Sequence, residues 1–302
     1  MPNRLILAAI LLLGSAAPAL SAETCSTPRP FRAMTYNIRL DTPADGQNAW
    51  AHRRGMFISQ VRLLGPALLG LQEVVPGQRA DMAAALPEYS ALGEGRDEGG
   101  AGEASPLFVD RAQFRVRSSG MFWLSPTPVV PSKGWDAAYR RVATWAHLRR
   151  RSDGKAVLAI NTHWDNVGKQ ARLNSALQLR GWIAAHRGAG EAVILLGDFN
   201  APLSEESLVA LLAPPRGLTP LNDARANSTE PAEGAQITFN GWDPIPKSGD
   251  TIDHILVGPG LKVLRYHALG ETFDGRLASD HFPVIADLFF SAAKDCVTGR
   301  HI

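Results

Sequence analysis

Cysteine is scarce in this chain, and the motifs of several common enzyme classes are missing. Only Cys25 and Cys296 occur among the 302 residues, and they form no C-x-x-C pair. The sequence also contains no H-E-x-x-H, G-x-S-x-G or Walker A motif and no intact G-x-G-x-x-G. Zinc proteases, serine hydrolases and nucleotide-dependent transferases therefore lose their main support as functional classes.

The net charge is small, and internal repeats are absent. Lys+Arg number 31 and Asp+Glu 29, which gives +2, and removal of residues 1–22 would take away Arg4 and no acid, leaving +1. A near-neutral chain lacks the broad basic surface that drives non-specific nucleic-acid binding, although a local basic cluster stays compatible with it. No repeat of about 20–50 residues and no heptad array is visible, which predicts one domain over residues 26–296.

A long hydrophobic run is also lacking, except for a short one near the start of the chain. The apolar residues 5–13 follow Arg4 and precede a region of small residues. This run is too short to span a bilayer, so residues 1–22 are predicted to be a secretory signal peptide, cleaved after Ala22 or Ala19. An uncleaved anchor is the alternative, and no lipobox precedes Cys25. We therefore expect an exported protein, periplasmic or extracellular, without a transmembrane segment in the mature chain.

The two cysteines lie near the two ends of the mature chain. In an exported protein, Cys25 and Cys296 predict a disulfide that joins the chain ends, with two free thiols as the alternative.

Short apolar runs typical of strands recur along the chain between helical patterns. Apolar residues near one face predict a helix over residues 48–64, through Trp50, Phe57, Val61 and Leu64, and a helix over residues 169–187, through Leu173, Leu177, Ile183 and Ala184. Gly-rich residues 93–105 and 228–250 are predicted to be long surface loops. Mixed strands and helices of this kind indicate α/β layers. The predicted strands cover residues 32–38, 67–74, 142–148, 156–163, 192–197, 251–257 and 282–290.

Polar residues stand where several of these strands begin or end. Because the start of one antiparallel strand lies beside the end of its neighbour, they could all meet along one sheet edge. Asp253 lies inside an otherwise apolar strand and therefore needs a partner, for which a histidine is the obvious candidate. The other strand-end residues are Asn37, Glu73, His163, Asp198, Asn200, Asp280 and His281. Each of them also has a structural alternative, such as a solvated acid, a buried hydrogen-bonded imidazole or a turn.

The segment "AVILLGDFNAP" shows this ambiguity most clearly. The strand period of two predicts that Asp198 and Asn200 point to one side while Phe199 points into the interior. Their oxygens suit a hard divalent cation and a phosphate. However, Gly, Asp, Asn and Pro are also the usual turn residues, so the motif alone favours a turn, with Gly197 and Pro202 predicted to form the bend.

Seven motifs in order give the sequence a family resemblance over residues 32–288. They are "MTYNIRLD", "LGLQEV", "RRVATWAHL", "NTHWDN", "LLGDFNAP", "TIDHILV" and "SDHFPV". Together they resemble the endonuclease/exonuclease/phosphatase superfamily, and in particular its small exported bacterial members. The resemblance implies a DNase I-like, four-layer α/β/β/α sandwich of two packed, mainly antiparallel mixed sheets flanked by helices. It also implies Mg²⁺-dependent cleavage of a phosphate ester, with Mn²⁺ as an alternative metal.

The resemblance also implies roles for individual residues. Glu73 matches the main metal-binding glutamate, with Asn37 and Asp280 nearby. Asp198 and Asn200 match the pair that aligns the nucleophilic water and holds the phosphate. The remaining matches are His281 as a catalytic histidine, Asp253 as its orienting acid, His163 as a second catalytic histidine, Arg141 as the phosphate-contacting arginine and Glu103 as an acid that orients His163. Whether Asp198 or the Asp253–His281 pair is the general base stays open at this point.

Two tryptophans and two departures from the family pattern complete the sequence evidence. Trp135 and Trp242 fall in predicted loops, where they line a substrate pocket or else pack their own loops. Asn166 stands where relatives often have histidine, and His254 where an aromatic residue is common.

The resulting prediction is an exported, Mg²⁺-dependent phosphohydrolase that acts as a monomer. Its substrate is a phosphate ester, either a diester or a monoester. Two alternatives remain at this stage: a secreted nuclease acting on DNA or RNA, and a non-catalytic phosphate-binding protein on the same scaffold.

Overall fold

The computed structural model describes residues 29–213 and 221–291. The predicted signal peptide, the predicted cleavage sites and both cysteines, Cys25 and Cys296, lie outside the described residues. Within the described ranges, no helix is long and apolar enough to cross a membrane.

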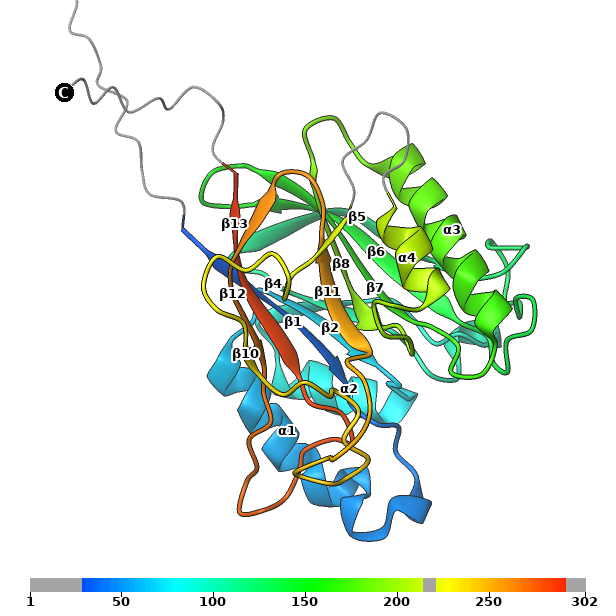
Figure 1. The fold of residues 1–302 in the computed structure, drawn as a ribbon, viewed down its shortest axis with the longest axis vertical. Helices are drawn as coiled ribbons and strands as arrows, with labels where there is room; N and C mark the ends of the chain where they lie inside the picture. Colours follow the sequence, from blue (N-terminus) through cyan, green and yellow to red (C-terminus); the bar gives the residue numbers. More distant parts are fainter. Residues whose placement is uncertain (1–28, 214–220, 292–302) are drawn as a thin grey trace, which may run out of the picture.

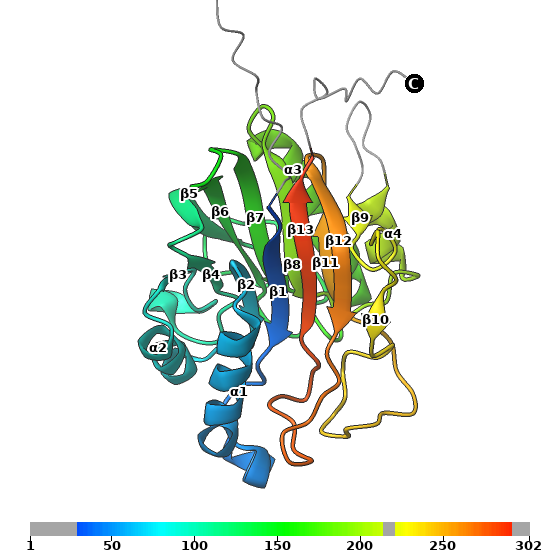
Figure 2. The ribbon, with the colours of Figure 1, turned by 90° about the vertical axis from the view of Figure 1, so that its left-hand side faces the viewer.

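Two mixed sheets pack face to face to form the centre of the molecule (Figures 1 and 2). The first sheet has the strand order β10-β12-β13-β1-β2-β4-β3, and the second has the order β5-β6-β7-β8-β11-β9. Most neighbouring strands are antiparallel, whereas β1–β2, β10–β12 and β7–β8 are parallel. The strands of the first sheet are β1 (Phe31–Asn37), β2 (Leu68–Gln72), β3 (Tyr89–Leu92), β4 (Leu107–Asp110), β10 (Glu233–Gly234), β12 (Leu261–Ala268) and β13 (Val284–Phe290). Those of the second are β5 (Phe114–Trp123), β6 (Val142–Arg150), β7 (Ala156–His163), β8 (Ala192–Asp198), β9 (Asn222–Asp223) and β11 (Asp253–Val257).

Helices cover the outer face of each sheet. Helices α1 (Trp50–Leu64) and α2 (Pro76–Ala85) pack on the first sheet, and α3 (Lys169–His186) and α4 (Glu206–Leu212) pack on the second (Figure 1). Short 3-10 helices η1 (Pro43–Asn48) and η2 (Glu98–Gly100) lie in the loops. Three hydrophobic clusters fill the three interfaces between the layers. This arrangement confirms the four-layer α/β/β/α sandwich.

A polar network lies between the two sheets, directly behind the edge where the candidate site is found. The Asn161 side chain donates to the carbonyls of Leu71 and Pro106, at 2.8 and 2.9 Å, and accepts from Gln72 Nε2 at 2.7 Å. Gly70 makes room for it, because a Cβ there would lie 2.5 Å from Asn161 Oδ1. A buried amide needs all these partners, so the network favours one alignment of the two sheets.

The predicted helix faces agree with the structure for α1 but not for α3. In α1, Trp50, Phe57 and Val61 are buried as expected. In α3, Leu177 is 48% exposed, and the face turned to the sheet is built instead from Ala171, Arg172, Ser175, Ala176 and Leu179. Of the predicted residues, Ile183 does pack, partly buried, against the hydrophobic cluster below α3. The buried Arg172 on this face donates Nε to Glu205 Oε1 at 2.7 Å.

Candidate active site

The strand register brings three of the predicted polar residues to one level of the second sheet. His163, at the end of β7, pairs with Asp198, at the end of the parallel strand β8. Asp253, at the start of β11, lies opposite Asp198 in the antiparallel pair. A single carboxylate at the centre therefore has a partner on each neighbouring strand.

Three residues that line the site, Arg39, Glu73 and Asn200, adopt a left-handed backbone that non-glycine residues rarely use. Glu73 has φ 62° and Asn200 has φ 49°. The Glu73 carboxylate accepts from Asn37 Nδ2 at 3.0 Å and from the Leu40 amide at 3.1 Å. Asn200 donates its side-chain amide to the Trp164 carbonyl and its backbone N–H to Asp198 Oδ1, both at 2.9 Å. Such strained conformations are retained where surrounding contacts fix them, commonly at functional sites.

The side chains of the "GDFN" segment point in the predicted directions, but for a different reason. Phe199 is fully buried, while Asp198 and Asn200 line the pocket. The strand ends at Asp198, so the left-handed backbone of Asn200, and not strand alternation, turns that side chain to the site. Gly197 does not form the bend. It lies within β8, where a Cβ would come 2.5 Å from the Thr162 carbonyl oxygen, so the close approach of β7 requires a glycine.

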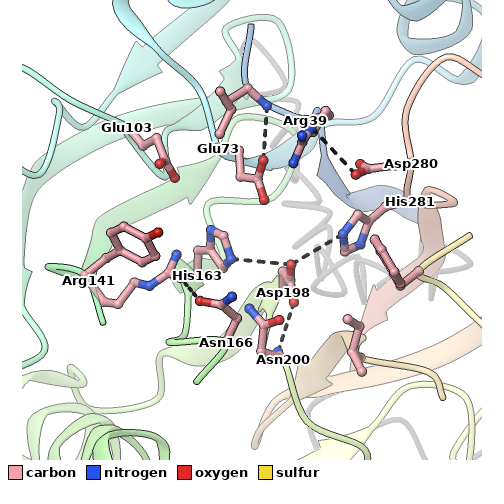
Figure 3. Close-up of a pocket in the computed structure, with 14 residues that line it drawn as sticks. Arg39, Glu73, Glu103, Arg141, His163, Asn166, Asp198, Asn200, Asp280 and His281 are labelled. Atoms are coloured by element: carbon pink, nitrogen blue, oxygen red, sulfur yellow. Dashed lines mark hydrogen bonds and ion pairs between the residues drawn. The ribbon is translucent and has the colours of Figure 1, made fainter. Parts of the chain in front are cut away.

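These residues surround a cavity of about 480 Å³ at the edge of the two sheets (Figure 3). Asn37 and Asp253 do not line the cavity but lie behind it, fully buried and bonded to lining residues. The lining residues are Arg39, Leu40, Glu73, Glu103, Tyr139, Arg141, His163, Asn166, Asp198, Asn200, Phe239, Ile252, Asp280 and His281.

Asp198 is the centre of the cavity floor, with one histidine on each side (Figure 3). Its Oδ2 accepts from Asn37 Nδ2 at 2.9 Å and lies 3.5 Å from His163 Nε2 and 3.8 Å from His281 Nε2. Burial and the neighbouring Asp253 raise the pKa of Asp198 to about 7. The carboxylate therefore exchanges a proton near neutral pH, as an efficient general base should.

The two histidines differ in protonation because their partners differ. His281 Nδ1 is 2.8 Å from Asp253 Oδ2, and this carboxylate outweighs the opposing effect of burial and raises the pKa of His281 to about 10. His163 Nε2 lies farther from a carboxylate, 3.5 Å from Asp198 Oδ2, and burial and the nearby Arg141 hold the pKa of His163 well below the usual value. At neutral pH, His281 is a cation and His163 is neutral.

Arg141 lies on the wall of the cavity next to His163. Its guanidinium is held by Asn166 Oδ1 at 3.1 Å and by Asp165 Oδ2 at 3.4 Å, and the side chain is almost fully buried. A rigid, pre-oriented guanidinium of this kind suits bidentate contact with a phosphate.

Glu103 lines the cavity but does not orient His163, which corrects the prediction. Both its carboxylate oxygens accept from Arg96, at 2.7 and 3.0 Å. Within the described residues the two acceptors are thus taken by Arg96, which belongs to the same Gly-rich loop. Burial raises the pKa of Glu103, against the opposing charge of Arg96.

The two predicted pocket tryptophans are also corrected. Neither Trp135 nor Trp242 lines the cavity. Trp135 is 38% exposed on its own loop, and the indole of Trp242 lies 5.4 Å from the guanidinium of Arg53. The aromatic walls come instead from Tyr139 and Phe239, which sequence reasoning missed. Tyr139 packs against Arg141, and the Phe239 ring lies 5.1 Å from that of His281.

The carboxylate oxygens of Glu73 and Asp280, on one wall of the cavity, fit a hard divalent cation. Glu73 and Asp280 both face the cavity (Figure 3). Burial raises the pKa of Asp280, and the charge of Glu73 raises it further, although His281 and Arg39 lower it. A cation near both carboxylates would relieve this repulsion, and carboxylate oxygens are the preferred ligands of Mg²⁺.

A second group of possible metal ligands lies at the cavity floor and directly behind it. Single ligand atoms of Asp198, Asp253 and His281 all lie within 4.8 Å of one another. Asp253 Oδ1 is buried and has no hydrogen-bond partner among the residues that the structure describes, but its other oxygen already accepts from His281. An imidazole in the set favours transition metals more than Mg²⁺, so the Glu73–Asp280 wall is the better fit for a hard cation.

Comparison with known proteins identifies relatives over almost the whole described chain. A family model described as the Endonuclease/Exonuclease/phosphatase family matches residues 34–281. No curated protein sequence matches the chain. Among solved structures, an endonuclease/exonuclease/phosphatase family protein from Bacteroides thetaiotaomicron is 33% identical, with a TM-score of 0.81, covering 88% of this chain and all of its own.

Two further solved structures extend the comparison. A mannosyl-6-phosphatase from the same species is 34% identical, with a TM-score of 0.80, and covers 86% of this chain and 100% of its own. The human Nocturnin catalytic domain is 20% identical, with a TM-score of 0.66, over 87% of this chain and 94% of its own, and it supports the fold alone.

Proposed function

Because the chain belongs to the endonuclease/exonuclease/phosphatase family, whose members are hydrolases acting on phosphate esters, we propose that it is a Mg²⁺-dependent phosphatase for small phosphomonoesters. A sugar phosphate is the first candidate substrate. The observation that carries the proposal is Asp198, buried between two histidines on the floor of a cavity with Arg141 and Arg39 on its walls.

We assign the general base to Asp198 and not to the Asp253–His281 pair. A pKa of about 7 lets the Asp198 carboxylate take a proton from water near neutral pH. His281, with its pKa raised to about 10, keeps its proton under the same conditions and acts as a cationic donor to a phosphate oxygen. Asp253 holds the His281 ring through Nδ1 and so directs Nε2 to the cavity.

The remaining side chains bind the phosphate and position it. Arg141 and the side chain of Asn200 stand ready to hydrogen-bond its oxygens, and neutral His163 adds a further hydrogen bond. Glu73 and Asp280, with Asn37 supporting Glu73, are the residues that would hold the metal. When bound, a divalent cation would neutralise charge that develops on the phosphate oxygens.

Three observations favour a small monoester over a polymer. The half-exposed aromatic rings of Tyr139 and Phe239 line the cavity, where the ring of a sugar leaving group could pack against them. The mannosyl-6-phosphatase is 34% identical to the chain over nearly its whole length. The near-neutral charge also gives little support for binding a long polyanion.

A substrate panel tests this assignment. Phosphate release from hexose 6-phosphates, inositol phosphates and glycerol phosphate is compared with cleavage of bis-p-nitrophenyl phosphate, DNA and RNA, each with Mg²⁺. We expect the highest kcat/KM on a hexose phosphate. Faster cleavage of diesters or nucleic acid than of any monoester would refute the monoester assignment.

A further inference from the structure

Arg53 is a fully buried cation in the first turn of α1, outside the cavity and outside the proposed chemistry. It is 0% exposed, and within the described ranges it forms no ion pair with a carboxylate at salt-bridge distance. All four of its hydrogen bonds go to main-chain carbonyls. Burial lowers its pKa, although the charge of Asp280 partly compensates. A buried cation of this kind costs stability, so its position calls for a reason.

The four carbonyls belong to segments that frame the site. Nη1 donates to the Ile38 carbonyl and, at 3.1 Å, to that of Ala278, while Nη2 donates to Arg39 at 2.6 Å. Nε donates to the Asn48 carbonyl at 2.7 Å. One guanidinium therefore ties the loop after β1 to the loop before β13.

Two indoles enclose the same guanidinium. It lies 5.0 Å from the Trp50 ring and 5.4 Å from the Trp242 ring. Trp242 belongs to a third loop, has φ 72°, and donates its backbone N–H to Asn240 Oδ1 at 2.8 Å. The Asn240 amide in turn donates to the Asp280 carbonyl at 2.8 Å. The Trp50–Arg53–Trp242 sandwich thus connects three loops that come from distant parts of the chain.

The connected loops carry the proposed metal and phosphate residues. Asn37, which supports Glu73, directly precedes the first loop, and Asp280 and His281 end the second. Ser279 Oγ adds a bond of 2.7 Å to the Asn37 carbonyl, between the same two segments. Arg53 therefore hydrogen-bonds to the segments that lead to Glu73 and Asp280, although it forms no hydrogen bond with either carboxylate among the described residues.

We propose that Arg53 is a positioning residue that sets the spacing of Glu73 and Asp280, and thereby the affinity of the site for a divalent cation. The inference rests on the proposed function, because that function identifies Glu73 and Asp280 as the metal ligands. The contacts of Arg53 do not depend on it. The planar guanidinium of Arg53 donates through three nitrogens to four carbonyls. Lysine has a single ammonium group and is therefore a poor substitute.

The test compares Arg53→Lys with a second buried arginine that packs on an aromatic ring. Arg150 is 7% exposed, lies 4.5 Å from the Phe290 ring and donates to the Arg29 carbonyl, far from the cavity. Isothermal titration calorimetry of metal-free protein gives the Kd for Mg²⁺ without turnover. We expect Arg53→Lys to raise this Kd about 10–100-fold and to lower kcat, and Arg150→Lys to change the Kd by less than about twofold.

Two further measurements test the positioning role of Arg53 even if Arg53→Lys folds poorly. Trp242→Leu removes one indole from a partly exposed loop, and it should raise the Kd for Mg²⁺ by about 3–10-fold with the fold intact. In Arg53→Ala, added guanidinium should restore part of the Mg²⁺ affinity, whereas sodium chloride at equal ionic strength should not.

The possible outcomes separate the two proposals. Wild-type Mg²⁺ affinity in both Arg53→Lys and Trp242→Leu would overturn the positioning role, even in an active enzyme. If wild-type protein binds Mg²⁺ yet hydrolyses no phosphate ester, the proposed function fails, and the titrations still decide the role of Arg53.

Discussion

At the scale of single residues, Asp198 decides what the site can do. Its carboxylate is buried beside a second carboxylate, Asp253, and this raises its pKa to about 7. A group whose folded-state pKa lies above its unfolded value is stabilised in its protonated form. The ionised carboxylate therefore destabilises the fold, and this cost grows as the pH rises from the unfolded pKa to about 7.

Replacing Asp198 by Asn should separate activity from stability. The amide cannot accept the proton from water, so we expect kcat to fall by at least about 100-fold. Because the buried charge is gone, Tm should rise, by about 2–4 °C for each kcal/mol recovered in a protein of this size. The rise should be larger at about pH 8 than at about pH 5, since the ionised form costs more there. Thermal unfolding at both pH values measures it, and a lower Tm for the variant at the higher pH would contradict the burial argument.

The pH dependence of kcat/KM should reflect the titration of two groups at the cavity floor, Asp198 and His281. Activity should increase as Asp198 loses its proton at a pKa of about 7, and decrease as His281 loses its proton at about 10. Asp253→Asn removes the charge that raises the pKa of His281, so the alkaline limb should move to lower pH. A profile measured across this range checks both limbs. An unmoved alkaline limb in Asp253→Asn would mean that another group titrates there.

The aromatic walls should act on the leaving group more than on the phosphate. Phe239→Leu keeps apolar contact with His281 but removes the flat ring, so KM for a hexose phosphate should rise about 3–10-fold. The inhibition constant of inorganic phosphate, which has no leaving group, serves as the control. Equal changes in both constants would indicate a disturbed phosphate site instead of lost recognition of the ring.

The strand-end residues could be identified from sequence because apolar runs end where polar side chains begin. Glu73, His163 and Asp198 were found in this way. Tyr139 and Phe239 could not be, since they stand in loops whose path depends on left-handed residues and tertiary bonds. Trp242 was misread for a related reason: nothing in its own loop indicates that Arg53, far away in the chain, supplies its partner.

At the scale of elements, the buried strands could be predicted from sequence because each contains a continuous apolar run. The predicted boundaries of β7 agree with the structure, and those of β1, β2, β6, β8, β11 and β13 differ by one or two residues at one or both ends. Strands β5 and β12 were missed, since their residues alternate between buried and exposed without a long apolar run. Strands β3, β4, β9 and β10 were missed because each has only two to four residues. The arrangement in two packed sheets came only from the resemblance, and the strand order was not predicted, because local patterns carry no information about non-local contacts.

Matched glycine substitutions test how tightly the two sheets pack behind the site. In Gly70→Ala the new Cβ would lie 2.5 Å from Asn161 Oδ1 and 3.1 Å from Leu196 Cβ, so unfolding free energy should fall by about 1–3 kcal/mol. In Gly55→Ala, on α1, nothing lies within 4 Å, and the better helix former should add about 0.5–1 kcal/mol. Chemical denaturation of both variants measures the difference. Equal effects of the two substitutions would contradict the close approach of the sheets.

At the scale of the whole molecule, the sandwich brings distant sequence motifs to a single edge. Asn37 and His281 are separated by most of the described chain, yet their segments are joined through Ser279. The family match and the 34% identical mannosyl-6-phosphatase agree with this arrangement. Export, the signal peptide over residues 1–22 and a disulfide between Cys25 and Cys296 stay predictions, which the intact mass of protein recovered from the periplasm or medium would test.

Metal-dependent hydrolysis at Asp198 is tested most directly by phosphate release from the best substrate of the panel. Wild-type protein is assayed with Mg²⁺, after chelation by EDTA, and after Mg²⁺ is restored, beside Asp198→Asn under the same conditions. We predict that EDTA abolishes release, that Mg²⁺ restores it, and that Asp198→Asn stays inactive throughout. Release that persists in EDTA, or that is unchanged in Asp198→Asn, would contradict the mechanism.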